Sequence, residues 1–430
     1  MATYIASTFP DSLTGAIFAF EGVADAAVVL NGPTGCKFFH SAVSDAQFPR
    51  SADYDPLSYA DRCYFGQPRV PSTYLDGDDY VFGSAQKLDE TLRVVASKGF
   101  SLIAVVNSPG AALIGDDLER LLAGALDDVL HLAIENTGSS GAYGDGFQLA
   151  VNSMLDTLAL PEVPKTPCSV NLLGLNLSQK HYEHNYATLR ELLMLCGIEV
   201  ISALGAGDGL KTVCRAREAE LNVVVCPETG LLTARKLAVE WGTPWLCVEE
   251  GQPIGFEATE SFVQHVCAAL GADPSAAALQ MEKARACAYL HLARFSSRLG
   301  LPKGAYYSLR ATPSMAYPFV RWLSGYLGMV PQAIELLPGE DSGHGDALRR
   351  YLEAICSEGA LGRRIVSTPS QLVLADGDTI AACRMEGHAT CGIEIGFPSL
   401  SYLDITRKQL YGPEGALWLL EQIVNGLRYV

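Results

Sequence analysis

Short apolar runs that end in glycine- or proline-rich loops constrain the fold of this chain more than any other feature. AAVVLNGPTGC (26–36) and SLIAVVNSPGAALIGDD (101–117) each predict a buried strand that enters a loop and then a helix. Further strand-like runs alternate with helical segments: SVNLLGL, IEVISAL, LNVVVC and PWLCVE. This alternation predicts an α/β fold with mostly parallel sheets, whose ligands lie at the loops after the strands.

The length of 430 residues is too great for one compact core. We expect three αβα domains with mostly parallel sheets: 1–165, 166–272 and 273–430. The third domain begins with a long helix predicted over 274–299, with Asp273 as its cap, because this segment is rich in strong helix formers.

Charge and hydropathy exclude several classes of function. The formal net charge is −17 and no basic run occurs, which argues against nucleic-acid binding. No apolar stretch reaches the roughly 20 residues that span a bilayer, and the N-terminus does not read as a secretion signal. We therefore expect a cytoplasmic protein. Hydrophobic residues make up 49% of the chain and charged residues only 18%, so much apolar surface must be buried, and we expect a subunit of an obligate oligomer.

Twelve cysteines are scattered along the chain without the spacing of a disulfide scaffold, a CxxC pair or a zinc site. Any metal site must therefore collect its ligands from distant segments or from a second chain. Cys36 follows a strand in NGPTGC, where two glycines and a proline predict a tight turn that directs the thiol away from the sheet. Cys226 ends the strand LNVVVC at the edge where a cofactor would lie. Both positions are also compatible with a small buried structural cysteine.

Other motifs point to no familiar chemistry. GAGDGLKT (205–212) fails the phosphate-loop template because Leu210 stands where the second glycine is required, so ATP binding by this chain is excluded. His388, near Cys391, is a candidate metal or proton site, and a histidine satisfied within its loop is the alternative. Serine nucleophile elbows, HExxH and GxGxxG motifs are absent, which excludes ordinary hydrolases and dehydrogenases.

Five segments together resemble the nitrogenase component 1 family, which includes nitrogenase catalytic subunits, cofactor-assembly scaffolds and protochlorophyllide, chlorophyllide and methylthio-alkane reductase subunits. They stand in the family's order: LTGAIFAFEGVADAAVVLNGPTGC, VPSTYLDGDDYVFGSAQKLDETL, ALIGDDLERLL, LNVVVCPETGLLTARKLAVEWGTPWL and IGFPSLSYLDITRKQLYGPEGALWLLEQIVN. The resemblance runs nearly end to end. It implies three Rossmann-like αβα domains, a sister component 1 subunit in a heterotetramer, and an ATP-dependent dimeric iron protein that donates electrons.

The resemblance also implies an iron–sulfur cluster between two subunits, to which each subunit gives up to three cysteines. The corresponding positions here are Asp11, Cys36 and Pro109, and only Cys36 keeps its thiol. The chain thus resembles subunits that give one cysteine to a [4Fe–4S] or P-cluster-like centre whose other ligands come from the partner. Asp11 is a candidate carboxylate ligand, and Cys63 is a metal candidate of lower rank.

The segment around Cys226 resembles the one that anchors the active-site cofactor of nitrogenase, which makes Cys226 a candidate ligand of a larger iron–sulfur metallocofactor. The second anchor would be a histidine within 401–404, where Tyr402 stands instead. The chain therefore does not resemble a dinitrogen-reducing subunit. The resemblance implies an oxidoreductase subunit active only within a complex. A non-catalytic scaffold for cofactor assembly and a structural subunit without a cluster are the alternatives, and no catalytic residue is assigned.

Overall fold

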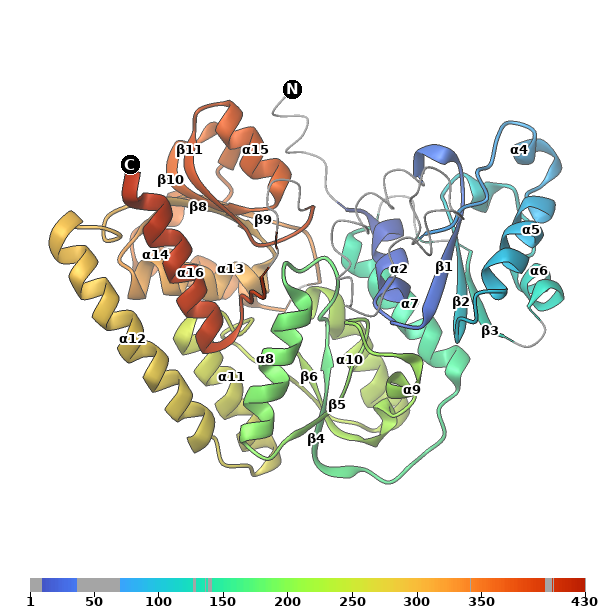
Figure 1. Cartoon of the computed structure of the whole chain (residues 1–430), viewed down its shortest axis with the longest axis horizontal. Coiled ribbons are helices and arrows are strands. Elements are labelled where there is room, and N and C mark those ends of the chain that lie inside the picture. Colours follow the sequence, from blue (N-terminus) through green and yellow to red (C-terminus); the bar gives the residue numbers. More distant parts are fainter. Residues whose placement is uncertain are drawn as a thin grey trace. The chain divides into compact units, whose positions relative to one another are not determined.

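The computed structural model describes residues 10–36, 70–126, 129–135, 137, 141–340, 342–398, 404 and 406–429. They form two compact units. The N-terminal unit comprises Pro10–Pro164 and Ser202–Arg217, and the C-terminal unit comprises Lys165–Ile201 and Glu218–Val430. Every strand pair with a described register is parallel. The predicted α/β class with mostly parallel sheets is confirmed (Figure 1).

The N-terminal unit contains a three-stranded sheet in the order β1-β2-β3. Its strands are β1 (Ala26–Asn31), β2 (Leu102–Asn107) and β3 (Leu130–Ile134). β1 and β2 are buried at every position, which explains why both segments read as continuous apolar runs. Asn31 and Asn107 are paired in register, so the loops that follow these strands leave the sheet at the same edge.

The N-terminal unit also contains eight described helical segments. They are α2 (Ser12–Glu21), α4 (Asp79–Phe82), α5 (Ala85–Ala96), η3 (Ala111–Leu113), α6 (Leu118–Ala125), α7 (Tyr143–Leu158), α9 (Leu210–Val213) and η4 (Ala216–Glu218). Of these, α2, α5, α6 and α7 pack against the sheet. Leu88, Leu92 and Val95 of α5 lie at helical spacing and join the core cluster with the sheet. A Cβ on Gly146 of α7 would lie 1.8 Å from the Ser12 carbonyl oxygen, so α2 and α7 can approach this closely only with glycine there.

The first sheet of the C-terminal unit has the order β5-β4-β6-β7. Its strands are β4 (Thr166–Leu173), β5 (Glu199–Ala203), β6 (Ala219–Val224) and β7 (Trp245–Cys247), and its helices are α8 (Tyr182–Leu195), α10 (Pro227–Trp241) and α11 (Gly255–Leu270). β5 lies on one side of β4 and β6 lies on the other, so the direction in which strands are added to the sheet reverses between β4 and β6. Loops at such a reversal form the usual ligand crevice of open parallel sheets.

The second sheet of this unit has the order β11-β10-β8-β9. Its strands are β8 (Tyr306–Ala311), β9 (Val330–Leu336), β10 (Ser370–Ala375) and β11 (Ala389–Glu394). The helical segments are α12 (Ser275–Leu299), α13 (Pro313–Val320), a π-helical turn (Arg321–Tyr326), α14 (His344–Ala354), η6 (Glu358–Ala360), η7 (Ile365–Ser367), α15 (Gly377–Met385), α16 (Gly412–Gly426) and η8 (Leu427–Tyr429). The predicted helix over 274–299 is α12, but its N-cap is Pro274 and not the predicted Asp273. The Asp273 carboxylate, one residue earlier, accepts the amide of Ser275 at 3.0 Å.

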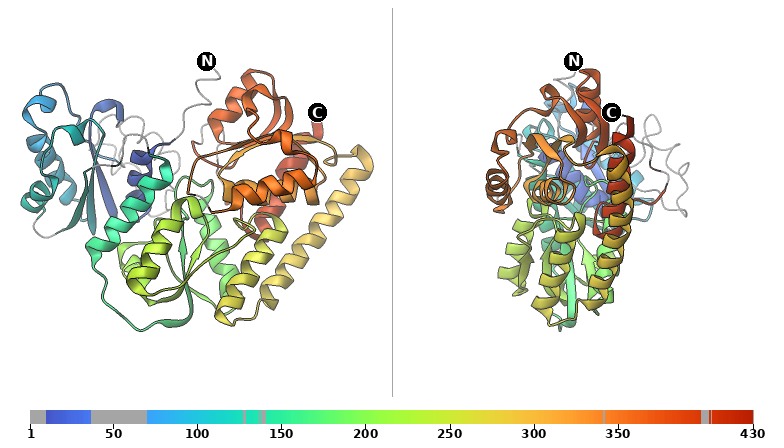
Figure 2. Two further views of the ribbon diagram at one scale, coloured as in Figure 1. Left: turned by 180° about the vertical axis from the view of Figure 1, so that it is seen from behind. Right: turned by 90° about the vertical axis from the view of Figure 1, so that its left-hand side faces the viewer.

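Each of the three predicted domain segments holds one sheet, but the second and third sheets belong to the same compact unit. The division at 165/166 and 272/273 therefore stays a prediction. Figure 2 shows α12 and α16 side by side in the C-terminal unit, in agreement with their contacts. Within the described part of the chain, every helix is too short or too polar to cross a lipid bilayer.

Candidate functional site

The loops after β1 and β2 are joined by buried side-chain amides. The Asn31 Nδ2 donates to the Asn107 Oδ1 at 2.9 Å, and the Thr73 hydroxyl donates to the Asn31 Oδ1 at 2.9 Å. The backbone amide of Gly32 in turn donates to the Thr73 Oγ1 at 3.1 Å. Asn31 and Asn107 are 1% and 5% exposed, so this network fixes the two loops without competition from water.

The same edge brings together the loops that carry Cys36 and Pro109. The amide of Ser108 donates to the Asn31 carbonyl at 2.9 Å, and a Cβ on Gly32 would lie 2.9 Å from the Ser108 side chain. Only glycine at position 32 allows this approach. Pro109 is exposed in the loop after β2.

Cys36 is half-buried and ends the described part of a helical turn that begins at Thr34. Burial raises the pKa of its thiol, and the negative charge of Asp11 raises it further. Burial also raises the pKa of Tyr80, as does the charge of Cys36. Asp11, Cys36 and Tyr80 are therefore electrostatic neighbours at this edge.

Asp11 has a structural role of its own. It is the N-cap of α2, and its Oδ1 accepts hydrogen bonds from the Thr14 amide at 2.9 Å and the Thr14 hydroxyl at 2.8 Å. One carboxylate oxygen is therefore engaged in the cap. Asp11 is exposed, so its side chain still contributes negative charge to the surface near Cys36.

The donor set at this edge fits part of an iron–sulfur site. Such clusters are held mostly by four cysteine thiolates, and among residues 10–36 and 70–126 the edge offers the single thiol of Cys36 with one carboxylate. No group of three or more metal-ligating side chains occurs within the described ranges of the chain. The negative charge of Asp11 disfavours the thiolate form of Cys36, and the positive charge of bound iron would offset this effect. Cys63, the other candidate of this region, lies outside the described residues.

Cys226 lies at the second candidate position, after β6 and at the N-cap of α10. It is 3% exposed, and its Sγ donates to the Glu228 Oε2 at 3.2 Å. The neighbouring loop after β4 touches it closely, since a Cβ on Gly174 would lie 2.1 Å from the Cys226 carbonyl oxygen. The structure thus places Cys226 where the strand order reverses, as the sequence predicts for the loop of a ligand crevice.

Glu228 fills the space next to this thiol with a buried carboxylate. Its Oε1 accepts the Ser314 amide at 2.8 Å and its Oε2 accepts the Ser314 hydroxyl at 2.6 Å. The Gln252 amide donates to the Ser314 Oγ at 2.9 Å, and the Tyr411 hydroxyl donates to the Gln252 Oε1 at 2.7 Å. We call Cys226, Glu228, Ser314, Gln252 and Tyr411 the Glu228 network.

The Glu228 network favours the neutral thiol of Cys226. Burial raises the pKa of Cys226 well above its ordinary value, and the Glu228 charge adds to this rise. Metal ligation requires the thiolate, so these surroundings do not fit Cys226 as a ligand in the arrangement described. Whether it holds a cofactor in a loaded complex stays a prediction. Sequence analysis missed Glu228. The available signal was its position two residues after Cys226, in the first turn of the helix, where a negative charge is favoured.

The segment 401–404, where a second anchor is expected, is described only at Asp404, and Tyr402 lies outside the described residues. The Asp404 carboxylate pairs with the Lys180 Nζ at 2.6 Å, and Lys180 also pairs with Glu394 at 3.2 Å. Beside this network, burial lowers the pKa of His181 to about 4. Sequence analysis missed this charge cluster, because Lys180 and Glu394 lie 214 residues apart in the chain.

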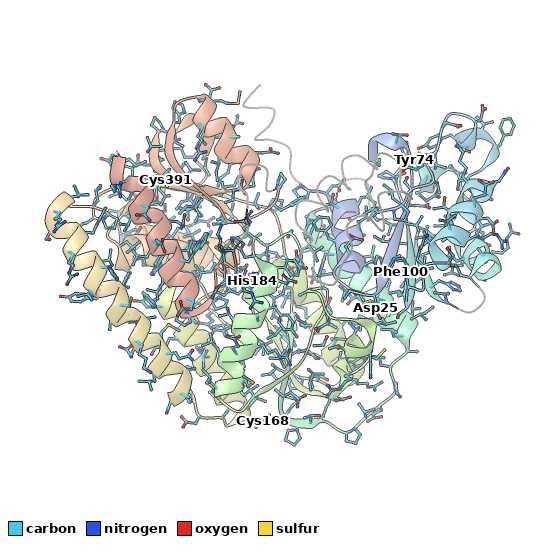
Figure 3. The ribbon with its side chains drawn as sticks, viewed as in Figure 1. Asp25, Tyr74, Phe100, Cys168, His184 and Cys391 are labelled. Carbon is cyan, nitrogen blue, oxygen red and sulfur yellow. The ribbon has the colours of Figure 1, made fainter. Side chains whose placement is uncertain are left out.

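The weaker motifs serve structural roles. The His388 Nδ1 lies 2.7 Å from the Val366 carbonyl oxygen, and Cys391 packs against Gly426 of α16. In the segment 205–212, the amide of Leu210 donates to the Asp25 carboxylate at 2.7 Å (Asp25 is labelled in Figure 3). A carboxylate of the chain itself therefore occupies the start of α9, where a phosphate loop would offer its amide to a nucleotide.

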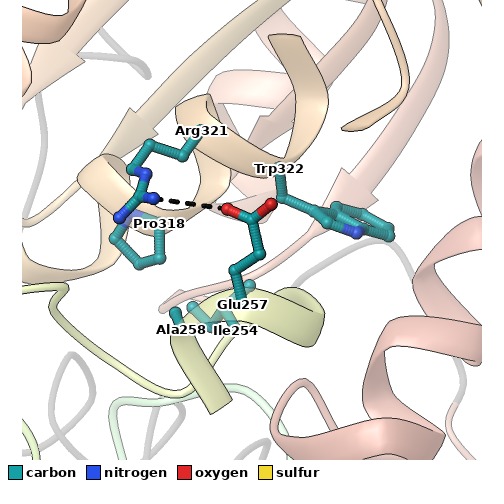
Figure 4. A pocket seen from close by; sticks show the side chains of 6 residues that line it. All are labelled: Ile254, Glu257, Ala258, Pro318, Arg321 and Trp322. Carbon is teal, nitrogen blue, oxygen red and sulfur yellow. Dashed lines mark hydrogen bonds and ion pairs between the residues drawn. The ribbon is translucent and has the colours of Figure 1, made fainter. Parts of the chain in front are cut away.

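A small surface pocket lies in the C-terminal unit between α11 on one side and α13 with the following π-helical turn on the other (Figure 4). Its lining residues are Ile254, Glu257, Ala258, Pro318, Arg321 and Trp322. An ion pair of 3.3 Å between Arg321 and Glu257 crosses it. None of the five residues of the Glu228 network lines this pocket, although the amide of its lining residue Ile254 donates to the Gln252 carbonyl at 2.7 Å.

Comparisons with known proteins agree with the fold and the order of the motifs. The chain is 26% identical over 260 residues to the nitrogenase iron-molybdenum cofactor biosynthesis protein NifE of Rhodobacter capsulatus, covering 59% of this chain and 50% of that protein. It is 25% identical over 259 residues to a light-independent protochlorophyllide reductase subunit of Nostoc sp., covering 57% and 47%. The chain spans about half the length of the curated relatives it matches.

A solved structure described as nitrogenase Cp1 at pH 6.5 superimposes with a TM-score of 0.73 at 17% identity, over 96% of this chain and 91% of that chain. At this identity the likeness shows the fold alone. The family model for nitrogenase component 1 type oxidoreductases matches residues 12–428, which is nearly the whole chain. The chain therefore belongs to the nitrogenase component 1 type oxidoreductase family.

Proposed function

We propose that this chain is a subunit of a nitrogenase-like, ATP-dependent reductase complex, in which Cys36 gives one thiolate to an iron–sulfur cluster shared with a sister subunit. The observation that carries the proposal is the edge after β1 and β2. It brings the loops of Cys36 and Pro109 together and sets Asp11 beside the thiol. With one thiol among the described residues of this edge, the remaining ligands would come from the partner.

The bound cluster, [4Fe–4S] or P-cluster-like, would supply one-electron transfer from an iron protein towards a substrate or a metallocofactor. The residues of this chain hold and tune it. Cys36 is the ligand, and the asparagine network fixes the two loops in one arrangement. Asp11 places a negative charge beside the thiolate, which favours the oxidised, more positive state of the cluster.

Exposed apolar side chains beside this edge support a partner surface. Val81 and Phe82 of α4 are 74% and 85% exposed, and Leu113 of η3 is 87% exposed. α4 adjoins the loop after β2, since a Cβ on Gly110 would lie 3.0 Å from the Tyr80 hydroxyl. Apolar side chains gathered in this way are typical of an interaction site. We assign this surface to the other proteins of the complex, the sister subunit and the dimeric iron protein.

A cytoplasmic location is part of the proposal, because exposed free thiols persist in a reducing compartment. Cys214, Cys287 and Cys356 are free and exposed. The iron protein would hydrolyse ATP, since the start of α9 in this chain is occupied by Asp25.

The second candidate function is a non-catalytic scaffold for metallocofactor assembly. The similarity to a cofactor biosynthesis protein favours it. As a scaffold, the chain would carry a larger iron–sulfur metallocofactor temporarily. Cys226 would be its candidate ligand once Glu228, which accepts a hydrogen bond from this thiol, moves away. A scaffold transfers its cluster to an apo-acceptor. A reductase oxidises its iron-protein donor in proportion to substrate.

The test is the content of iron and acid-labile sulfide, with electron paramagnetic resonance, in the complex purified anaerobically with its partner. We expect Cys36→Ala to lose the cluster signal. Cys214→Ala, which removes an exposed thiol of the same unit, serves as the matched control and should retain it. Equal iron in both variants, or no iron in the wild-type complex, would contradict the proposal.

A further inference from the structure

Helix α4 is a single helical turn that charged side chains anchor at both ends. At its start, the Lys87 Nζ pairs with the Asp79 Oδ2 at 2.6 Å. Behind its end, the Asp116 Oδ2 accepts the amide of Ser84 at 2.6 Å and the hydroxyl of Ser84 at 2.7 Å. Tyr80 lies between these two anchors, so its position on the N-terminal unit is fixed through the backbone of α4.

The hydroxyl of Tyr80 lies against the loop after β2. A Cβ on Gly110 would lie 3.0 Å from the Tyr80 hydroxyl oxygen and 3.3 Å from the Tyr80 Cε1, so the ring packs on the backbone of this loop. The hydroxyl is also hydrogen-bonded to Ser108, which is 1% exposed. A Cβ on Gly32, in the loop after β1, would lie 2.9 Å from the Ser108 Oγ. One serine side chain therefore separates the Tyr80 hydroxyl from the loop that carries Cys36.

The hydrogen bonds around Ser108 run in one direction. The Ser108 Oγ accepts the amide of Ala111 at 3.3 Å. The bond between Ser108 and Tyr80 lowers the pKa of the phenol, which is the effect of a donor that stabilises the phenolate oxygen. With the serine as donor, the proton of the Tyr80 hydroxyl is available to a further acceptor. Successive bonds of this kind polarise one another, so the phenol becomes a stronger donor.

The negative charge beside Tyr80 identifies this acceptor. Burial raises the pKa of Tyr80 most, and the negative charge of Cys36 raises it further. The phenol is therefore protonated at neutral pH and can donate a hydrogen bond. With iron bound at Cys36, the sulfur atoms of the site would carry negative charge. Hydrogen bonds to such sulfur atoms are among the factors that set the reduction potential of an iron–sulfur cluster.

We propose that the Tyr80 hydroxyl donates a hydrogen bond to a sulfur atom of the iron–sulfur centre that Cys36 holds, and that it raises the reduction potential of this centre. The donor stabilises the reduced state, because that state carries the greater negative charge. Tyr80 and Asp11 then act on the potential in opposite directions. This role presupposes the cluster of the proposed function and adds a second residue of the chain to the same site.

The test is the midpoint potential of the cluster in the complex purified anaerobically with its partner, from a redox titration followed by electron paramagnetic resonance. Tyr80→Phe removes the hydroxyl and keeps the ring that packs on Gly110. The ratio of oxidised to reduced cluster at a fixed potential should rise about tenfold, which is a midpoint potential about 59 mV lower for one electron. Tyr289→Phe is the matched control. It removes a phenol hydroxyl that is 73% exposed on α12 of the C-terminal unit, and it should leave the potential unchanged.

Electron–nuclear double resonance adds a readout that a merely structural tyrosine would not change. Tyr80 is 38% exposed, so its hydroxyl proton exchanges with deuterium from the solvent. The wild-type complex should show a coupling between the cluster and an exchangeable proton that Tyr80→Phe lacks and Tyr289→Phe keeps. Circular dichroism and iron content check that each variant is folded and loaded.

Three results would overturn this role. One is an unchanged potential in Tyr80→Phe with iron retained, which leaves the proposed function standing. Another is the loss of iron from folded Tyr80→Phe while Tyr289→Phe keeps it, because the phenol oxygen is then a ligand and not a hydrogen-bond donor. A wild-type complex without iron overturns both this role and the proposed function.

Discussion

The carboxylate of Glu228 accepts two hydrogen bonds from Ser314, one from the amide at 2.8 Å and one from the hydroxyl at 2.6 Å. Glu228 lies in the first turn of α10 and Ser314 in the first turn of α13. One carboxylate, 2% exposed, therefore joins the starts of two helices that belong to different sheets. Helix N-termini favour negative charge, which compensates for the burial of this group.

The first prediction concerns this pair. Ser314→Ala should lower the free energy of unfolding by about 1.5–3 kcal/mol, because a hydrogen bond to a charged group is lost. A double-mutant cycle with Glu228→Gln should give a coupling of about 1–3 kcal/mol. All four tryptophans, at 241, 245, 322 and 418, lie in the C-terminal unit, so urea unfolding followed by tryptophan fluorescence reports on it. Purely additive effects would show that the pair is not coupled.

The second prediction compares two glycines with positive φ. Gly174 has φ +88°, and a Cβ there would lie 2.1 Å from the Cys226 carbonyl oxygen. Gly242 has φ +64° and open space around the Cβ position. Gly242→Ala should cost about 1 kcal/mol of stability from backbone strain alone. Gly174→Ala should cost about 2–4 kcal/mol, because the backbones must also separate. Similar losses in tryptophan-monitored unfolding would contradict the close approach.

The third prediction concerns pH and His181, which lies edge-on to Trp418 with ring centroids 5.4 Å apart. Burial lowers its pKa to about 4, while the unfolded chain has a value near 6.5. Between these values the unfolded state binds more protons, so stability is full above pH 6.5 and falls as the pH drops to 4. His181→Asn should remove about 1–2 kcal/mol of the loss between pH 7.5 and pH 5.

Asparagine suits this position, because His181 has a positive φ of 60°. His265→Asn, an exposed histidine on α11, serves as the control in urea titrations at both pH values. If both variants keep the wild-type pH dependence, His181 does not cause the acid sensitivity.

The fourth prediction concerns the asparagine network beside Cys36. Asn31→Ala removes the hydrogen-bond partner of the Asn107 Oδ1 and of the Thr73 hydroxyl, so the loops after β1 and β2 should open more often. The amides of Gly32 and Ser108 should exchange hydrogen about tenfold faster or more. Gln86→Ala, which removes an exposed amide on α5 of the same unit, should leave these rates unchanged. Unchanged rates in Asn31→Ala would show that the network does not hold the loops.

Local patterns predicted the elements around both cysteines. The apolar runs before Cys36 and Cys226 are β1 and β6, and the helix formers after Asp273 are α12. Helix α13 begins at Pro313 and passes into a π-helical turn at Arg321. Local propensity does not reveal this change in helix type, within which the rings of Trp322 and Tyr326 are stacked with centroids 6.5 Å apart.

The sequence by itself determined the α/β class and the placement of Cys36 and Cys226 at strand ends, because hydrophobic periodicity and turn residues act over a few positions. It also determined the family, through the resemblance of its motifs in their order along the chain. Only the tertiary structure decided what surrounds each thiol. Cys36 stands half-buried near Asp11, and Cys226 is enclosed beside Glu228, which is held by Ser314 from 86 residues further along the chain. Charge and burial depend on such distant neighbours, and the identity of a residue does not specify them.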